Sequence, residues 1–407
     1  MEWATVRLRD VAEIVMGQSP PGETYNDAGD GLPFFQGKAD FGDHFATPRK
    51  WCSAPSRIAQ AGDILLSVRA PVGPTNVARE ESCIGRGLAA IRAIPGRAHQ
   101  DYLRFFMRHQ EPILALQGQG STFSAIRRAE VEGMVLPLPP LSEQRRIVEI
   151  LDQADRLRRL RAEADAKADR ILPALFIKMF GDPATNPMGW PRRKVAQVAK
   201  TGSGGTPATK REDFYGGAIP WVKSGELATR VVLSTEDTIT EEGLRNSSAK
   251  WVEPGAILIA MYGATVGQVA LLGIRATTNQ AVCAIEPHTE VVSEYMSEFL
   301  RMSKPLLLSR RVGGAQPNIS QQIIRDLDVP IPSLALQKRF AAEMANVESA
   351  QSNSVLVGDR LGQLFAVLLN QAFSADLTAS WREGHMKELL QEMEQQAKAL
   401  AHVEAGS

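Results

Sequence analysis

The residue types that most often do chemistry are present in this 407-residue chain, but they do not form a catalytic pattern. No two of the six histidines lie four residues apart with a glutamate between them, as in zinc proteases. The three cysteines, Cys52, Cys83 and Cys283, are too scattered for a disulfide framework or a zinc cluster, and they indicate a reducing compartment. We therefore predict no catalytic residue and no metal ligand.

Nucleotide-binding motifs are also missing from the sequence. The stretch GLPFFQGKA is close to a phosphate-binding loop, but it has five residues between its glycines and has Ala39 where that loop needs Ser or Thr. No Gly-rich dinucleotide fingerprint follows a strand-like run. These absences favour a binding protein over an enzyme.

The overall charge is balanced, with 46 basic and 46 acidic residues, so bulk charge alone does not hold this protein to nucleic acid or membrane. A local basic face remains compatible with that balance. The N-terminal sequence MEWATVRLRD lacks the apolar core of a signal peptide, and no window approaches eighteen unbroken apolar residues. We expect a soluble, cytoplasmic protein.

The chain is a tandem duplication. PLPPLSEQRRI at 137–147 returns as PIPSLALQKRF at 330–340, and GDILLSVRAPVG from Gly62 returns as GAILIAMYGATVG from Gly255. GLPFFQGKAD from Gly31 matches GAIPWVKSGE from Gly217, and both repeats keep one order of motifs. Strand-like runs that end in Gly-containing turns, with a few short helices, predict a mixed α and β domain in each repeat.

A long helix follows each domain. In the first, apolar or small residues alternate steps of three and four from Ile147 to Leu175, with Ser142 as the expected N-cap and Pro173 expected to kink or end the helix. In the second, the same spacing runs from Met344 to Ala372. Both rows are most polar in the middle, so we expect the helices to pair antiparallel. The alternative is that each helix packs on its own domain.

A doubled binding protein suits a target that is itself twofold, and duplex DNA is the common case. A helix of about 31 residues spans roughly 46 Å at ~1.5 Å per residue, against ~34 to 36 Å for one DNA turn. The two helices could therefore hold two domains on successive major-groove faces. Loops differ between the domains more than junctions do, which predicts two different half-sites.

Candidate DNA contacts are basic, amide and hydroxyl residues in and around the loops of both repeats, because phosphates and base edges accept such donors. The candidates are Lys38, Arg69, Arg86, Ser121, Thr122, Arg127, Arg128, Lys223, Ser224, Tyr262, Arg275, Arg310, Arg311, Gln316 and Asn318. Lys38 is paired with Lys223 and Ser224, and Arg69 with Tyr262. Each of them could instead be an ordinary surface residue.

Five motifs resemble, in order, the specificity subunit of type I restriction-modification enzymes: PLPPLSEQRRIVEILDQAD, PIPSLALQKRFAAEM, GAIPWVKSGEL, FGDPATNPMGW and LLNQAFSADLT. The resemblance covers about residues 1–381. It implies an α+β protein with two target-recognition domains, each reading half of a bipartite DNA site, separated by conserved helices that fix the spacer. It also implies no catalytic site and no cofactor on this chain, with S-adenosylmethionine, ATP and Mg²⁺ on methyltransferase and restriction subunits.

On this basis we divide the chain into domain 1 at 1–139, helix 1 at 140–180, domain 2 with its leading junction at 181–332, helix 2 at 333–373, and a C-terminal segment at 374–407. Because QRR and QKR recur at one register, we expect them to help present the docking surface of two methyltransferase subunits. These residues are Gln144, Arg145, Arg146, Gln337, Lys338 and Arg339. Charges on the helices could equally face solvent.

The sequence departs from the family pattern at two places near its end. Ala375 stands where the family usually has Gly, and the tail after Trp381 is longer than expected, with Met386, Leu389 and Met393 on one face of a possible helix. The tail is either an additional docking helix or a solvated end. A nuclease or methyltransferase with a specificity region, and a duplicated scaffold without a DNA role, remain the competing readings.

Overall fold

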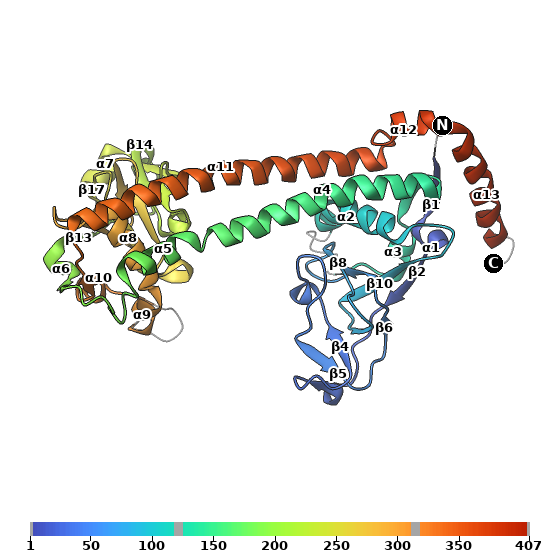
Figure 1. Cartoon of the computed structure of the whole chain (residues 1–407), viewed down its shortest axis with the longest axis horizontal. Helices are drawn as coiled ribbons and strands as arrows, with labels where there is room; N and C mark the ends of the chain where they lie inside the picture. Colours follow the sequence, from blue (N-terminus) through green and yellow to red (C-terminus); the bar gives the residue numbers. More distant parts are fainter. Residues whose placement is uncertain (1–2, 118–124, 311–317, 405–407) are drawn as a thin grey trace. The chain divides into compact units, whose positions relative to one another are not determined.

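The computed structural model describes residues 3–117, 125–310 and 318–404, and the chain divides into two compact units. Unit 1 is Met1–Arg161 with Val357–Ser407, and unit 2 is Ala162–Leu356. Each unit holds one globular domain, part of the helix that follows it and part of the other long helix (Figure 1). The unit boundaries therefore cut both long helices internally.

The first domain is built from two sheets and a two-stranded ribbon. One sheet has the order β2 (Ala12–Met16), β10 (Leu88–Ala93), β7 (Ile64–Ser67) and β8 (Thr75–Val77), and it is antiparallel throughout. The other has the order β3 (Tyr25–Asn26), β5 (Lys50–Cys52), β4 (Leu32–Phe35), β9 (Ser82–Ile84) and β6 (Ile58–Ala59). In it β4 and β9 run parallel. The ribbon joins β1 (Ala4–Arg7) to β11 (Val135–Leu138).

The second domain repeats this plan. Its first sheet has the order β13 (Ala199–Ser203), β21 (Val282–Pro287), β18 (Ile257–Ala260), β19 (Val269–Leu272) and β15 (Val231–Val232). Its second has the order β16 (Asp237–Ile239), β14 (Tyr215–Val222), β20 (Ala276–Thr278) and β17 (Trp251–Val252), with β14 parallel to β20. The ribbon is β12 (Arg192–Lys194) with β22 (Asp328–Pro330). The predicted duplication is confirmed in plan, since each domain has two sheets, a parallel pair in the second sheet and a ribbon, although the described sheets differ by one strand between the domains.

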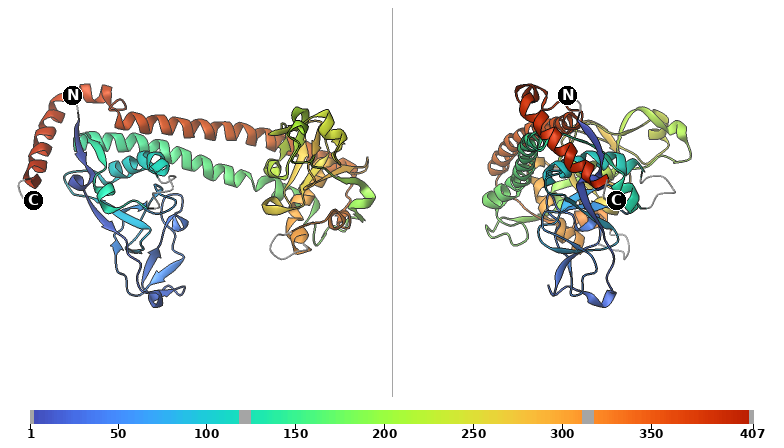
Figure 2. Two further views of the ribbon diagram at one scale, coloured as in Figure 1. Left: turned by 180° about the vertical axis from the view of Figure 1, so that it is seen from behind. Right: turned by 90° about the vertical axis from the view of Figure 1, so that its right-hand side faces the viewer.

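Helices and turns connect the strands in both domains. The first domain has α1 (Leu8–Val11), η1 (Gly22–Thr24), η2 (Lys38–Asp40), α2 (Gln100–Gln117) and α3 (Arg128–Glu132). The second has α6 (Val195–Val198), η3 (Glu212–Phe214), η4 (Ser224–Ala228), α7 (Glu241–Arg245), η5 (Gly263–Thr265), α8 (Ser293–Met302), α9 (Lys304–Ser309) and α10 (Gln321–Arg325). Figure 2 shows the domains from two further sides.

The long helices are α4 (Leu141–Ala168) and α11 (Leu334–Phe373), and they pair antiparallel within each unit. In unit 1 the start of α4 and the end of α11 share one core with the domain, through Ile147 and Leu151 on α4 and Phe365 on α11 (Figures 1 and 2). In unit 2 Ser354 Oγ of α11 donates to Asp165 Oδ1 of α4 at 2.7 Å. Each helix thus also packs on its own domain where it begins.

The apolar row predicted for the first helix is only partly correct. Ile147 is fully buried, but Leu157 is 56% exposed and Ile171 47% exposed. The buried positions instead include Val148, Leu151 and Asp155, because α4 packs on α2 as well as on α11.

The first long helix ends near Pro173, as predicted, but it does not begin at the predicted N-cap. The chain leaves α4 after Ala168 and α5 (Ile171–Phe180) begins next, with Pro173 in its first turn, where proline is tolerated. The predicted N-cap is wrong, since α4 starts at Leu141 and the Pro140 carbonyl accepts from Gln144 N at 2.9 Å. Among the described residues, no helix is long and apolar enough to cross a bilayer.

Candidate nucleic-acid interface

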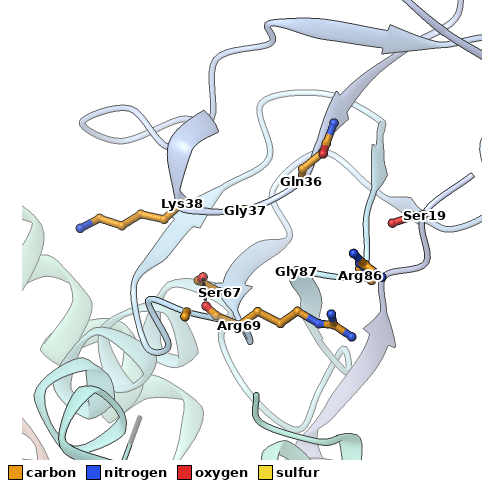
Figure 3. Close-up of a pocket in the computed structure, with 9 residues that line it drawn as sticks. Ser19, Gln36, Gly37, Lys38, Ser67, Arg69, Arg86 and Gly87 are labelled. Atoms are coloured by element: carbon orange, nitrogen blue, oxygen red, sulfur yellow. Dashed lines mark hydrogen bonds between the residues drawn. The ribbon is translucent and has the colours of Figure 1, made fainter. Parts of the chain in front are cut away.

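The loops at one end of the first domain surround a hollow of about 250 Å³. Ser19, Gln36, Lys38, Arg69 and Arg86 line it together with glycines and the end of β7 (Figure 3). Gln36 is the first residue after β4, and Arg86 follows β9. Because β4 and β9 are parallel, their carboxyl ends bring these two loops to the same edge. The structure thus groups three of the predicted DNA contacts.

Backbone hydrogen bonds fix the loops to one another. Val68 N donates to Gly87 O at 2.9 Å, and Ile126 N donates to Val68 O at 2.8 Å. Gln36 N donates to Oδ2 of the buried Asp40 at 2.7 Å. A Cβ at Gly87 would lie 2.1 Å from the Gln36 carbonyl oxygen, so this close approach requires glycine. The side chains that line the hollow are therefore displayed from a well-defined frame.

The hollow is positively charged. Lys38, Arg69 and Arg86 form no ion pair with any residue that the structure describes. Figure 3 shows the Arg69 side chain extending toward the side on which Arg86 lies, whereas the side chains of Lys38 and Gln36 point away from both arginines. Two unpaired guanidinium groups side by side are suited to phosphate oxygens or to the acceptor edge of guanine.

The second domain carries the same frame with different side chains. Met261 N donates to Ala281 O at 2.7 Å and Ile319 N to Met261 O at 2.8 Å, as Val68 and Ile126 do in the first domain. Lys223 is the first residue after β14, which makes it equivalent to Gln36. The predicted pairing of Lys38 with Lys223 is therefore corrected; Lys38 and Ser224 each begin the short helix that follows.

The remaining equivalences follow from the same hydrogen bonds. Tyr262 matches Arg69, since each forms an isolated β-bridge, Tyr262 to Asn318 and Arg69 to Ala125. Gln280, just before Ala281, occupies the position of Arg86 before Gly87. Sequence reasoning missed Gln36 and Gln280, although it included amide side chains, because only the backbone hydrogen bonds at Gly85, Gly87, Asn279 and Ala281 show which loop residues are equivalent.

Lys223 differs from its neighbours in being paired. Its Nζ contacts the Asp237 carboxylate and lies 3.9 Å from Glu236 Oε2. The hydrogen bond to Asp237 raises the pKa of Lys223. The Lys223 amine therefore stays protonated, and the Asp237 carboxylate partly neutralises its charge and holds it in place. Tyr262, by contrast, is 40% exposed.

Other predicted contacts are not brought into these groups. Arg275 precedes β20, at the opposite end of that strand from Gln280, and it pairs with Glu253 at 2.8 Å while lying over the Trp251 ring. Arg128 pairs with Glu132 at 2.6 Å. Arg127 and Arg310 are exposed at helix ends. Ser121, Thr122, Arg311 and Gln316 lie outside the described residues.

Gln144 and Gln337 are fully buried, so they could help to present a docking surface only by positioning their helices and not by contacting a partner directly. Gln144 Oε1 accepts from His99 N at 2.7 Å and its Nε2 donates to Pro139 O at 2.8 Å. Gln337 does the same with Val292 N and Pro332 O, both at 2.9 Å. Each glutamine ties its long helix to the domain before it. Arg145, Lys338 and Arg339 are exposed, and Arg146 pairs with Glu149 at 3.0 Å.

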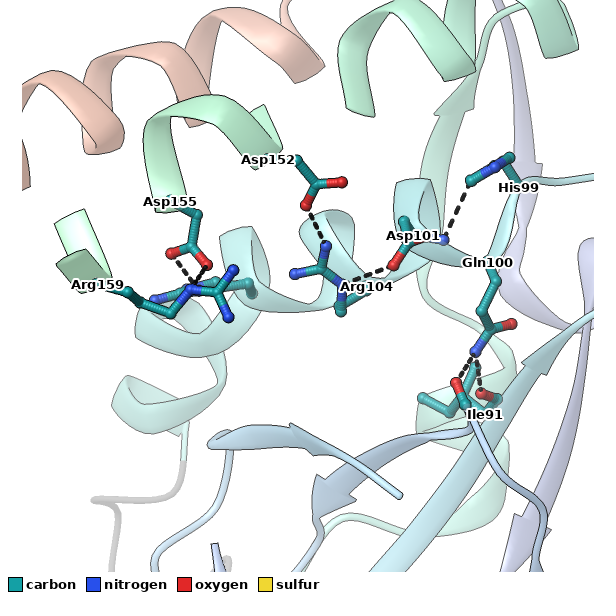
Figure 4. Close-up of polar contacts among 10 residues, drawn as sticks. Ile91, His99, Gln100, Asp101, Arg104, Asp152, Asp155 and Arg159 are labelled. Atoms are coloured by element: carbon teal, nitrogen blue, oxygen red, sulfur yellow. Dashed lines mark hydrogen bonds and ion pairs between the residues drawn. The ribbon is translucent and has the colours of Figure 1, made fainter. Parts of the chain in front are cut away.

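A buried carboxylate, Asp155, joins α4 to α2. Its oxygens lie 3.1 Å from Arg108, 2.9 Å from Arg158 and 3.2 Å from Arg159. Figure 4 shows Asp155 and Arg159 beside the Asp152–Arg104 pair, which joins the same two helices. Burial alone would raise the pKa of Asp155, but the arginines outweigh it and lower the pKa below its usual value.

The C-terminal tail packs on the first junction. It forms α12 (Ala379–Gly384) and α13 (Met386–Glu404), and Leu389 is fully buried. Glu392 Oε2 accepts from Ser142 N at 3.0 Å, and Gln396 Nε2 donates to Arg97 O at 3.3 Å. The prediction of a solvated end is therefore wrong for this part of the tail.

A second buried carboxylate holds the chain ends at that junction. Glu143 accepts from Trp3 Nε1 at 3.0 Å, Thr378 Oγ1 at 2.7 Å and Arg382 Nε at 2.8 Å. Its equivalent in the second repeat is Leu336, so the duplication gave no signal for it.

Known proteins share this architecture. One solved chain, from work on complex assembly and conformational transition of the type I R-M system, matches with a TM-score of 0.58 at 19% identity, covering 92% of this chain and 98% of that one. The type I restriction-modification S subunit of M. genitalium matches with a TM-score of 0.55 at 14% identity, over 92% and 96%. At these identities the likeness shows the fold.

The sequence relatives align with this chain over about the length of one repeat. A protein of Methanocaldococcus jannaschii described as the MjaX type I restriction enzyme specificity subunit is 39% identical over 158 residues, which is 38% of this chain. The EcoR124I/EcoR124II specificity subunit of Escherichia coli is 28% identical over 172 residues, or 41% of this chain. The aligned segments span 37% and 42% of those relatives' own lengths.

The family model for the type I restriction modification DNA specificity domain matches twice, at residues 1–167 and 187–354. The two matches fall on the two repeats seen in the strands and helices. The chain therefore belongs to the family of type I restriction-modification DNA specificity domains.

Proposed function

We propose that this chain is the non-catalytic DNA-specificity subunit of a type I restriction-modification complex. Each domain reads one half of a bipartite DNA site, and the long helices set the spacer between the halves. The observation that carries the proposal is one loop frame built twice with different side chains, Arg69 and Arg86 in one domain against Tyr262 and Gln280 in the other. One frame with two sets of side chains suits a site whose halves differ.

The chemistry of methyl transfer and cleavage would then lie on partner subunits. S-adenosylmethionine, ATP and Mg²⁺ belong to those subunits in this proposal, and the chain contributes the choice of sequence. Phosphate contacts from unpaired cations such as Lys38 would position the domain, while contacts to base edges would determine which sequence is bound.

A selection experiment tests the DNA-reading role. The complex is isolated from its own cells through a tag on this chain and is offered duplexes of random sequence. We expect enrichment of two short blocks separated by a fixed gap, with overall affinity falling as salt rises. Binding that depends on salt but enriches no sequence would reject the proposal.

Two methyltransferase subunits are proposed to dock one per repeat. The candidates for direct contact are the charges that recur at one register: Arg145 with Lys338, both exposed, and the half-buried Arg146 with the exposed Arg339. Reversing Arg145 and Lys338 to Glu should reduce co-purification of methyltransferase subunits, since surface charges at a rim steer association. Arg156→Glu, on the same α4 but away from the junction, is the matched control. Unchanged co-purification in the double variant would remove this assignment.

A further inference from the structure

Three backbone positions recur in both domains and differ in side chain each time. The first is the residue directly after β4 or β14, and the second is the second residue after β7 or β18. The third is the residue that precedes Gly87 or Ala281, whose carbonyl oxygens accept the backbone hydrogen bonds described above. We propose that these positions determine base specificity, with Gln36, Arg69 and Arg86 reading the first half-site and Lys223, Tyr262 and Gln280 the second. The inference rests on the proposed function and assigns residues within it.

The frame supports this because it is the same in the two domains. The loops after β7 and β18 accept one backbone bond and donate another at matching residues, with N–O distances that differ by no more than a few tenths of an ångström: 2.9 and 2.8 Å in the first domain, 2.7 and 2.8 Å in the second. The preceding strands end at equivalent residues, because Phe35 O accepts from Gly85 N at 2.8 Å and Val222 O from Asn279 N at 2.9 Å. A constant backbone leaves the side chains as the variable.

The side chains at these positions differ in hydrogen-bonding chemistry. The first domain offers one amide and two guanidinium groups that pair with no described residue, and the second offers an amine, a phenol and an amide. Arginine donates in parallel to guanine O6 and N7, and glutamine both donates to and accepts from adenine. The first domain should therefore prefer guanine where Arg86 reads, and the second adenine where Gln280 reads.

Neighbouring candidates do not share this placement. Lys38 begins the short helix η2 and occupies none of the three shared positions. Arg275 lies at the other end of β20 and is paired with Glu253. Arg128 is paired within its own helix. They serve as controls that carry the same charge on the same protein.

The test is a reciprocal exchange in the whole complex, isolated through a tag on this chain and offered random duplexes. Arg86→Gln places the second domain's residue in the first domain, and Gln280→Arg does the reverse. Both side chains are exposed, and thermal unfolding of each variant verifies that folding is unchanged. Arg275→Gln and Arg128→Gln are the matched charge controls.

We expect Arg86→Gln to lower the preference for guanine at one base pair of one block by roughly tenfold or more, leaving the other block as it was. Gln280→Arg should alter the other block alone. A guanine preference that survives Arg86→Gln, or a uniform loss of affinity for all sequences, overturns the inference. Failure of the unaltered complex to select any sequence would instead overturn the proposed function, so the two failures are distinct.

Discussion

At the scale of single residues, Asp155 is a buried charge that joins α4 to α2. Three arginines from two helices converge on a carboxylate whose side chain is only 2% exposed. The second repeat has Glu348 at the equivalent place, 3.4 Å from Arg230, and burial raises the pKa of Glu348 despite that partner. The two repeats thus keep an acid here but surround it differently.

Asp155→Asn should lower the free energy of unfolding of the full chain by about 3 kcal/mol, because it leaves three arginines without their shared counter-charge. Since the folded-state pKa of Asp155 is lowered, its contribution is complete above the ordinary Asp pKa of about 4 and is lost as the pH falls through the lowered value. Urea unfolding between pH 3 and 7 measures both effects.

The control for that prediction is Glu149→Gln, which breaks an exposed pair with Arg146 on the same helix. It should cost less than about 1 kcal/mol at any pH. Equal losses in the two variants would mean that Asp155 has no special structural role.

Ala375 adopts a positive φ of 68°, which is unfavourable for a residue with a side chain. Ala375 O accepts from Arg382 at 2.7 Å, which helps to hold this conformation. Ala375→Gly should raise the free energy of unfolding by up to about 1 kcal/mol, as relief of strain exceeds the added chain entropy. Ala379→Gly, at the start of α12, should instead destabilise. Thermal unfolding of both variants gives the comparison.

At the scale of elements, the strands and the two long helices were predictable from periodicity, whereas their packing was not. β7 and β18 lie where the two apolar runs predicted them, at residues 64–67 and 257–260. The predicted seam on α4 failed at Leu157, because packing on α2 as well as on α11 places the buried face at Val148, Leu151 and Asp155 instead. Gln144 and Gln337 were identified by recurrence, but recurrence does not distinguish an internal tie from a docking contact.

The tail gives the prediction at this scale. Deleting residues 383–407 removes Glu392, whose carboxylate accepts a hydrogen bond from Ser142 N, and exposes the first turn of α4. Amide exchange near Ser142 should then become faster, while exchange near the equivalent Ala335 in the second repeat stays the same and serves as an internal control. Unaltered exchange at Ser142 would show that the tail does not stabilise this junction, and loss of partner subunits would add a docking role.

At the scale of the whole molecule, the duplication explains why the proline-rich junction occurs twice. Each copy ends a domain and fixes the start of a long helix, through Gln144 in one repeat and Gln337 in the other. The sequence predicted two domains and basic loops, but the grouping of Arg86 with Gln36 depends on β4 and β9 being parallel, which no local pattern reveals. Arg275 was predicted on charge alone and lies at the wrong end of its strand.

The most direct test of the account is to map methylated positions across the genome in cells with and without this gene. The account predicts that deletion abolishes one motif made of two short defined blocks separated by a gap of fixed length, and that restoring the full chain restores it. Loss of a single continuous motif, or no loss at all, would contradict the claim that two domains read two separate halves.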